Sequence, residues 1–263
     1  MRGGLQRNGY GYHVFSIAAL VPSPPILVPE LCGAATGAVA GLPDDPRAEL
    51  RAAVLAAARE LAAVTDRWTV IGTGAADQVF GPGTVGTFRG FGADVRVALS
   101  ASASAEPDPQ HPLPILIAGW LREQVAPAVS AEVRVIDAAT PTQRCWELGA
   151  KLRAELEGSD GRQGVLVVAD GAATLSLKAP GYLDERAAAV QDELDRALRE
   201  GDRVGLRALE PELCAELVMS GRAAYQVLAG LFDSDPAVET RYQAAPFGVG
   251  YDVSLWRPAG RRE

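Results

Sequence analysis

The chain alternates apolar runs of strand length with amphipathic runs of helix length, and this alternation limits the possible folds more than any other feature. Residues 164–169 read GVLVVA, an uninterrupted apolar run typical of a strand that is buried on both faces. Residues 183–199 then form an amphipathic pattern in which Val190, Leu194 and Leu198 recur every four residues. The alternation predicts an α/β fold, with one three-layer α/β/α domain and a mainly parallel central sheet.

The same alternation extends over most of the chain. Further strands are expected at residues 14–20, 68–71, 94–99, 132–136, 240–243 and 251–256, and further helices at residues 46–64, 114–125 and 142–157. The first of these helices has a clear start, because Asp45 can cap it and Pro46 suits the first helical position. With no internal repeat or linker, residues 13–257 are expected to form a single domain, between a frayed or over-annotated start at residues 1–12 and a tail at residues 258–263.

Composition excludes several classes of partner. Of the 263 residues, 48% are apolar and 22% charged, and the net charge is −8, which suits a globular domain and argues against a nucleic-acid partner. No apolar run approaches the ~20 residues of a membrane span, so no membrane partner is expected either. Cys32, Cys145 and Cys214 form no CxxC pattern, which predicts neither a zinc site nor a disulfide framework and favours a cytoplasmic location. Arg2 and Arg7 precede an apolar run as in a signal peptide, but prolines interrupt that run at once.

A proline-rich segment follows the first expected strand. Residues 20–31 read LVPSPPILVPEL, with Pro22, Pro24, Pro25 and Pro29 inside eight residues. Proline removes a backbone donor and disfavours both helix interiors and paired strands. We therefore expect a rigid, extended loop at the carboxyl end of the strand, which is the edge of open α/β sheets where ligands bind.

Three further segments carry recognisable patterns. Residues 164–184 read GVLVVADGAATLSLKAPGYLD, residues 220–227 read SGRAAYQV, and residues 246–256 read PFGVGYDVSLW. Together with the proline-rich loop, and in this order, they resemble the class III extradiol ring-cleavage dioxygenases, the LigB-like superfamily. The resemblance runs from residue 14 to residue 256 and implies the three-layer fold expected above.

In that family the proline-rich loop reads roughly P-H-P-P-x-L-x-P-E, and its histidine binds a catalytic iron. The resemblance places Ser23 at this position. A second histidine ligand would follow the second strand, where this chain has residues 71–75, IGTGA. The acid/base histidine would lie in the loop at residues 170–175, DGAATL, and one branch of the family carries a cysteine where this chain has Ser220. Every position that the resemblance assigns to a ligand or base is therefore substituted.

The only two histidines, His13 and His111, lie outside these motifs. Extradiol cleavage needs Fe(II) held by two histidines and a carboxylate. We therefore expect no metal and no cofactor, although the resemblance implies iron, and we expect an extradiol dioxygenase-like protein without ring-cleavage activity. Two alternatives stay open: a non-haem Fe(II) dioxygenase that uses unrecognised ligands, and a metal-free enzyme centred on Asp170.

Seven residues are candidates for a binding site, and each also has a plainer interpretation. Asp170 follows the most buried strand and is the one catalytic candidate, but it would equally suit an Asx turn. Ser23 and Thr73 would contact a ligand or simply complete turns, and for Thr73 this is a Gly-rich turn predicted at residues 72–74, after the strand at residues 68–71. Lys178, Tyr182 and Arg222 would bind a carboxylate or phosphate only if they converge. With Ser220, the full set is Ser23, Thr73, Asp170, Lys178, Tyr182, Ser220 and Arg222.

These residues lead to an expected pocket and an expected ligand. Small residues in place of histidines leave space, so a modest polar pocket is expected, lined by Ser23, Thr73, Asp170 and Ser220 with Tyr182 nearby. The expected ligand is a small aromatic or anionic molecule, a partner protein is the alternative, and a homo-oligomer stays open.

Overall fold

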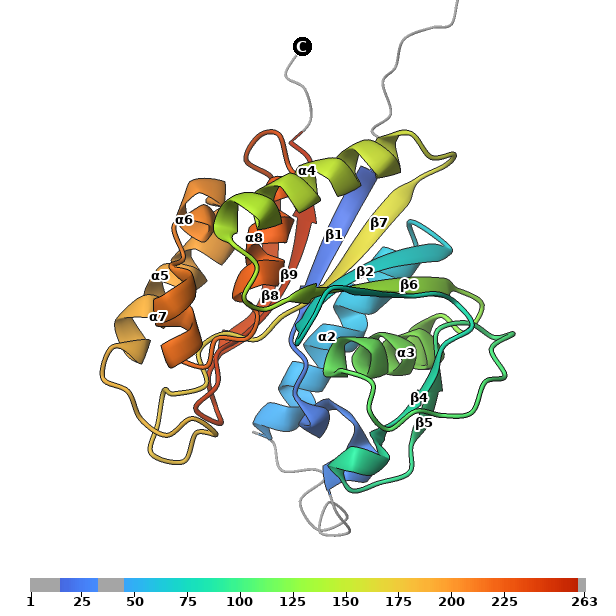
Figure 1. Cartoon of the computed structure of the whole chain (residues 1–263), viewed down its shortest axis with the longest axis horizontal. Coiled ribbons are helices and arrows are strands. Elements are labelled where there is room, and N and C mark those ends of the chain that lie inside the picture. The colour runs from blue at the N-terminus through green and yellow to red at the C-terminus, as the bar shows by residue number, and fades with distance from the viewer. Residues whose placement is uncertain (1–14, 33–44, 260–263) are drawn as a thin grey trace, which may run out of the picture.

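The computed structural model describes residues 15–32 and 45–259, and His13 and the predicted chain start at residues 1–12 lie outside them. Within the described residues, seven strands form one sheet (Figure 1). They are β1 (Phe15–Val21), β2 (Arg67–Gly74), β3 (Gln78–Phe80), β6 (Ser130–Asp137), β7 (Gln163–Val168), β8 (Ala237–Ala244) and β9 (Tyr251–Arg257). A separate two-stranded sheet pairs β4 (Val85–Thr87) with β5 (Arg96–Ala98).

The large sheet is mixed, with the strand order β3-β6-β2-β7-β1-β9-β8. The four strands β6, β2, β7 and β1 pair in parallel, whereas β3 on one side and β9 and β8 on the other pair antiparallel. The expectation of a mainly parallel sheet is therefore met only in the centre. Strands β8 and β9 pair antiparallel because a short loop joins them directly, and β3 runs opposite to β2 and β6 because it follows β2 after a short connection.

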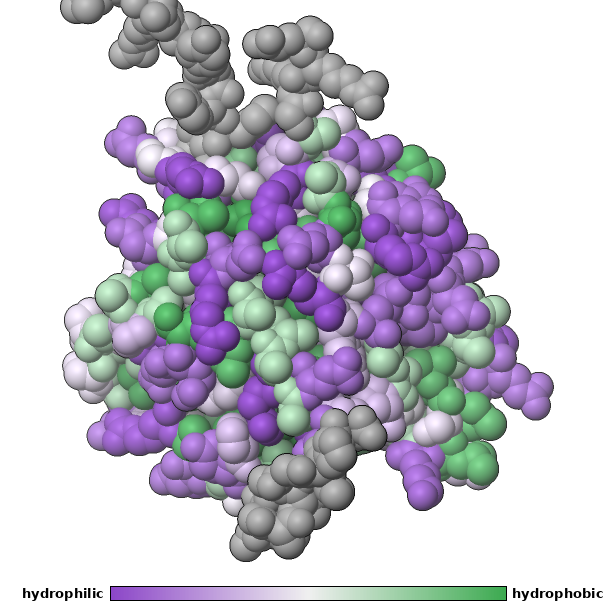
Figure 2. Space-filling model, turned by 180° about the vertical axis from the view of Figure 1, so that it is seen from behind, coloured by the Kyte–Doolittle hydropathy of each residue, from purple (hydrophilic) through white to green (hydrophobic). Residues whose placement is uncertain are grey.

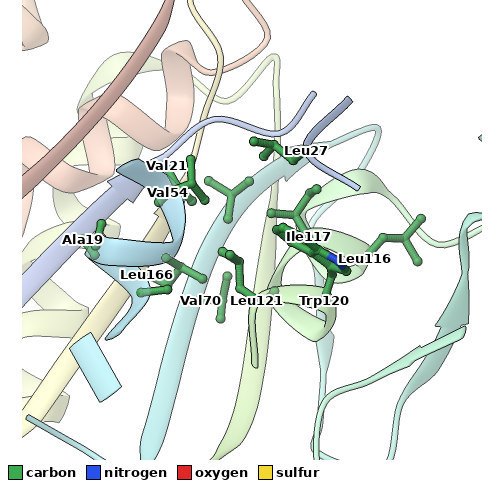
Figure 3. Packing of buried hydrophobic residues seen from close by; sticks show 14 of the residues in the cluster. Ala19, Val21, Leu27, Val54, Val70, Leu116, Ile117, Trp120, Leu121 and Leu166 are labelled. Atoms are coloured by element: carbon green, nitrogen blue, oxygen red, sulfur yellow. The ribbon is translucent and has the colours of Figure 1, made fainter. Parts of the chain in front are cut away.

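Helices pack on both faces of this sheet (Figure 1). They are α2 (Pro46–Ala62), α3 (Leu113–Val125), α4 (Thr142–Glu157), α5 (Ala187–Glu200), α6 (Arg203–Arg207), α7 (Pro211–Glu216) and α8 (Arg222–Gly230). The core on one face joins the strands to α2 and α3, and the core on the other joins them to α4, α5 and α8. Figure 3 shows the first of these cores, where Val54 of α2 and Trp120 of α3 lie with Val70 of β2 and Leu166 of β7.

The alternating pleat of the strands produces these two cores. In β1, Ala19 and Val21 belong to the core under α2 and α3, while Ala18 and Leu20 belong to the core under α4, α5 and α8. A strand buried on both sides has no polar face, which is why β1 and β7 read as continuous apolar runs.

Several element boundaries follow directly from local sequence signals. The Asp45 side chain accepts a hydrogen bond from the Arg47 amide at 3.0 Å, and Pro46 occupies the first turn of α2, as predicted. Helix α4 covers the predicted residues 142–157. Helix α5 instead begins at Ala187, because residues 171–186 are held in turns, for example by the Asp184 amide donating to the Thr174 carbonyl at 3.0 Å.

Two sequence-based expectations about loops were wrong. The Gly72-Thr73-Gly74 segment is the end of β2 and not a turn, because β6 pairs with it as far as Gly74. The proline-rich loop is not simply extended, since it contains two short 3₁₀ turns, η1 (Pro25–Leu27) and η2 (Pro29–Cys32). The fixed φ of proline suits such turns, and the Pro25 carbonyl still accepts a hydrogen bond from the Val28 amide at 2.9 Å.

The surface of the molecule is largely polar on the side that faces away in Figure 1. Figure 2 shows polar side chains over most of that side, with apolar side chains scattered between them. In the described ranges, no helix combines the length and the apolar character required to cross a bilayer.

Candidate functional site

The loops that follow β1, β2 and β7 meet at the carboxyl edge of the parallel strands, as predicted. The loop before β9 joins them there, because the Gly171 amide donates to the Gly250 carbonyl at 2.8 Å and the Gly250 amide donates to the Ala172 carbonyl at 3.0 Å. The amide of Leu175 also donates to the Gly248 carbonyl at 3.1 Å. Four segments that are far apart in sequence therefore surround one edge of the sheet.

Ser23 and Asp170 form the centre of this edge. The Ser23 amide donates to Oδ1 of Asp170 at 2.9 Å, and the Ser23 hydroxyl donates to Oδ2 of the same carboxylate. Ser23 is 7% exposed and Asp170 is partly buried. Asp170 is thus fixed by a two-point contact with the position at which the resemblance places an iron ligand.

The pKa of the Asp170 carboxyl group is higher in the folded protein than it would be in water. Burial raises the pKa of its carboxyl group, and the two hydrogen bonds from Ser23 oppose that rise. A buried carboxyl group with a raised pKa is suited to proton exchange, and open α/β sheets commonly bind ligands at this edge.

Thr73 and Ser220 join the same cluster through backbone contacts. The Thr73 hydroxyl donates to the Ser220 carbonyl at 2.8 Å, and the Gly221 amide donates to the Asp170 carbonyl at 3.1 Å. We call Ser23, Thr73, Asp170 and Ser220 the edge cluster. The structure brings these four predicted residues together across β1, β2, β7 and the start of α8.

Lys178, Tyr182 and Arg222, by contrast, do not converge. Lys178 and Tyr182 lie exposed on the loop at residues 171–186, and Tyr182 is 64% exposed. Arg222 is 2% exposed and directs its guanidinium group toward the loop after β6. Its Nη1 donates to the Thr140 carbonyl at 2.6 Å, and its Nη2 donates to the Ala138 carbonyl. The shared anion site that would need all three side chains is therefore absent from the described part of the chain.

Sequence reasoning missed Gln191, which supports the edge cluster from α5. Its Oε1 accepts a hydrogen bond from the Ala172 amide at 2.9 Å. The side chain packs so closely on Gly171 and Gly250 that a Cβ atom at Gly171 would lie only 3.0 Å from Cδ of Gln191. The available signal was a glutamine among the buried positions of α5, between Ala187 and Leu194.

Asp252 of β9 is a second buried acid that sequence reasoning missed. It is 2% exposed, and it accepts hydrogen bonds from the Ser254 hydroxyl at 2.6 Å and from Nε2 of Gln243 at 2.9 Å. Burial raises the pKa of Asp252 to about 7, although these hydrogen bonds oppose the rise. The signal in the sequence was an acidic residue inside the apolar strand YDVSLW.

The residues present do not suit the iron that the resemblance implies. In residues 15–32 and 45–259, no three His, Cys, Asp or Glu side chains lie close enough together to hold a metal ion. His111 packs edge-on against Phe80, with ring centroids 5.2 Å apart, and its Nδ1 lies 3.7 Å from a carboxylate oxygen of Asp108. The Ser23 hydroxyl is already bonded to Asp170.

Comparisons with known proteins support the fold but do not identify a function. No protein-family model matches the chain, and no curated protein sequence matches it. A crystal structure of an uncharacterized protein from Escherichia coli K12 is similar, with a TM-score of 0.53 and 10% sequence identity. The match covers 92% of this chain and 99% of that protein, so it includes nearly the whole α/β fold.

Proposed function

We propose that this protein is a LigB-like relative of the class III extradiol dioxygenases that binds a small molecule at the edge cluster and does not cleave aromatic rings. The observation that carries the proposal is the pairing of Ser23 with Asp170. At the place where the family would hold a metal, this chain has a serine whose amide and hydroxyl groups both bond to a carboxylate.

The chemistry of the edge cluster favours a ligand with hydrogen-bond donors. The carboxylate oxygens of Asp170 and the hydroxyl oxygens of Ser23 and Thr73 all retain lone pairs that can accept hydrogen bonds. Phenolic hydroxyl groups of an aromatic ligand would donate hydrogen bonds to these acceptors, whereas the negative charge of Asp170 would repel an anion. Of the two ligand classes that the sequence left open, a hydroxylated aromatic molecule suits this cluster. The polar pocket expected around the four residues stays a prediction.

A metal-free enzyme is the second candidate function, and the raised pKa of Asp170 favours it. A buried carboxyl group can transfer a proton to or from a bound hydroxyl group. The Ser23 hydroxyl donates to Asp170, and a nucleophilic serine would need a base in this position. Catalysis of this kind would depend on Asp170 and would need no metal.

Metal content and ring cleavage test the proposal most directly. Purified protein should contain far less than one iron per chain, and it should give no yellow ring-opened product with 3,4-dihydroxybenzoate in the presence of Fe(II) and dioxygen. The expected result follows from the donor set, because hydroxyl groups are poor ligands for Fe(II) and glycine offers none. Stoichiometric iron with turnover, lost on His13→Ala or His111→Ala, would restore the dioxygenase.

Ligand binding is tested by thermal shift with catechol, a hydroxylated aromatic molecule that is neutral at pH 7. Binding only to the folded state raises Tm, and a ligand at one hundred times its Kd stabilises by about 2.7 kcal/mol. Ser23→Ala and Asp170→Asn should each reduce the shift, because each removes a polar partner of the ligand. Ser16→Ala at the other end of β1 is the matched control and should keep the full shift. Equal shifts in all four proteins would place the ligand elsewhere.

A further inference from the structure

A cavity of about 490 Å³ lies beside the edge cluster, on the side of the sheet covered by α4 and α8. Three segments line it and leave it open to solvent: the loop after β6, helix α7, and the residues that precede α8. Its walls are mostly apolar, with Ala139, Pro211, Ala215, Val218 and Met219 among the lining residues. This volume is in the range of small-molecule sites.

One wall of the cavity carries a buried positive charge. Arg222 lines the cavity and is 2% exposed, and its guanidinium bonds to the carbonyl groups of Ala138 and Thr140 and, at 3.0 Å, to Oε1 of Gln226. All of these acceptors are neutral. No carboxylate of the described residues lies within ion-pair distance of Arg222, so its charge lacks the counterion that buried charges normally require.

The start of α8 adds to the positive potential at the same wall. Helix α8 begins at Arg222, its N-cap Gly221 has no side chain, and its first turn contains no acidic residue. The N-terminal end of a helix carries a partial positive charge. In this helix the Gly221 and Arg222 amides already donate to the Asp170 and Met219 carbonyls, so the helix end contributes its charge and no free donor from these two residues. Ser220, directly before this end, also lines the cavity. A single negative group placed here would meet both charges.

The remaining lining residues limit the ligand further. Glu212 is exposed at the cavity and would repel a second negative charge. Val218 is held at φ 53°, a conformation that β-branched residues rarely adopt, and its side chain stays 46% exposed. The Met219 amide fixes this turn by donating to the Cys214 carbonyl at 2.8 Å. Such backbone strain is typical of binding sites that are preformed.

We propose that this cavity is a second binding site, for a small monocarboxylate with an apolar body. The carboxylate would face Arg222 and the start of α8, and the apolar body would lie against Ala215, Val218 and Met219. The site adjoins the edge cluster and shares Ser220 with it, but its charged group is a different one, because Asp170 points to Ser23 whereas Arg222 points to the loop after β6. The inference does not rest on the ligand proposed for Asp170.

Benzoate and its neutral isostere benzamide test the proposal on the full chain. Titration calorimetry and thermal shift should show saturable binding of benzoate, with binding of benzamide at least tenfold weaker. Ala215→Phe fills the cavity without touching Arg222 and should weaken benzoate at least tenfold. Ala189→Phe, an exposed alanine on α5, is the matched control and should leave the affinity unchanged.

The outcomes separate this site from the one at the edge cluster. Asp170→Asn should leave the affinity for benzoate unchanged. If this variant no longer binds benzoate, then benzoate occupies the edge cluster. Equal binding of benzamide, or full benzoate binding to Ala215→Phe, would overturn the proposal. If inorganic phosphate competes with benzoate at a similar concentration, the apolar lining does not contribute to binding, and the proposed apolar body of the ligand is wrong. If benzoate does not bind saturably, the proposed second site is wrong. That result would not affect the separate proposal that catechol binds at Asp170.

Discussion

Replacing Asp252 with asparagine should remove a large part of the pH dependence of stability between about pH 4 and about pH 8. The pKa of Asp252 is about 7 in the folded protein, against a reference value of 3.8. The folded state therefore binds more protons than the unfolded state in this range, so the free energy of unfolding falls as pH rises. A shift of this size corresponds to about 4 kcal/mol, fully expressed above the folded pKa.

Asparagine cannot ionise, and it can still hydrogen-bond to Ser254 and Gln243. The stability of Asp252→Asn relative to the wild type should therefore rise by up to about 4 kcal/mol from pH 4 to pH 8. Urea unfolding at a series of pH values measures this difference. Part of the slope will remain in the variant, because burial also raises the pKa of Asp170 and Asp195.

Asp184 provides a control of opposite sign. Arg186 lowers the pKa of Asp184 to about 2, so its contribution to stability is present above its unfolded pKa and is lost as pH falls toward 2. Asp184→Asn should change the slope of stability against pH only below about pH 4 and leave the slope from there to pH 8 intact. Parallel wild-type and Asp252→Asn profiles from pH 4 to pH 8 would show that Asp252 is solvated in the folded state.

Replacing Gly149 with alanine should destabilise the protein by about 3 kcal/mol or more, as severe overpacking does. Gly149 lies in α4 where this helix crosses α8, and an added Cβ atom would press on the Val227 carbonyl oxygen and lie 2.8 Å from Cα of Gly230. These are backbone atoms, so only a displacement of α8 could relieve the contact. Because α8 starts at Arg222, the variant should also weaken benzoate binding.

Gly158 at the end of α4 is the matched control for this substitution. A Cβ atom there would lie 3.5 Å from the nearest atom, the Ala154 carbonyl oxygen, and its φ of −83° suits any residue. Gly158→Ala should therefore change stability by less than about 1 kcal/mol, with stabilisation favoured by the lower entropy of the unfolded chain. Chemical denaturation of both variants gives the comparison. Similar small changes in both would mean that α4 and α8 are farther apart than described.

The sequence by itself determined the features that depend on neighbouring residues. The bounds of α4, the cap at Asp45 and the buried strand β7 follow from periodicity, capping chemistry and apolar runs, which act over a few residues. The sequence also placed Ser23 and Asp170 at one edge, because loops that leave the carboxyl ends of parallel strands share that edge. The folded structure adds that these two side chains bond to each other.

Only the tertiary structure decided features that depend on contacts between distant segments. Pairing with β6 makes Gly72–Gly74 part of a strand although the local residues favour a turn, and the antiparallel pairs of β3 with β6 and of β9 with β1 join strands that are far apart in sequence. The direction of Arg222 is decided by carbonyl groups more than eighty residues earlier in the chain, at Ala138 and Thr140. Burial of Asp252 beside α5 is likewise a property of packing. Local periodicity cannot encode these results, because the free energy of a buried charge or a strand pair depends on partners that only folding brings together.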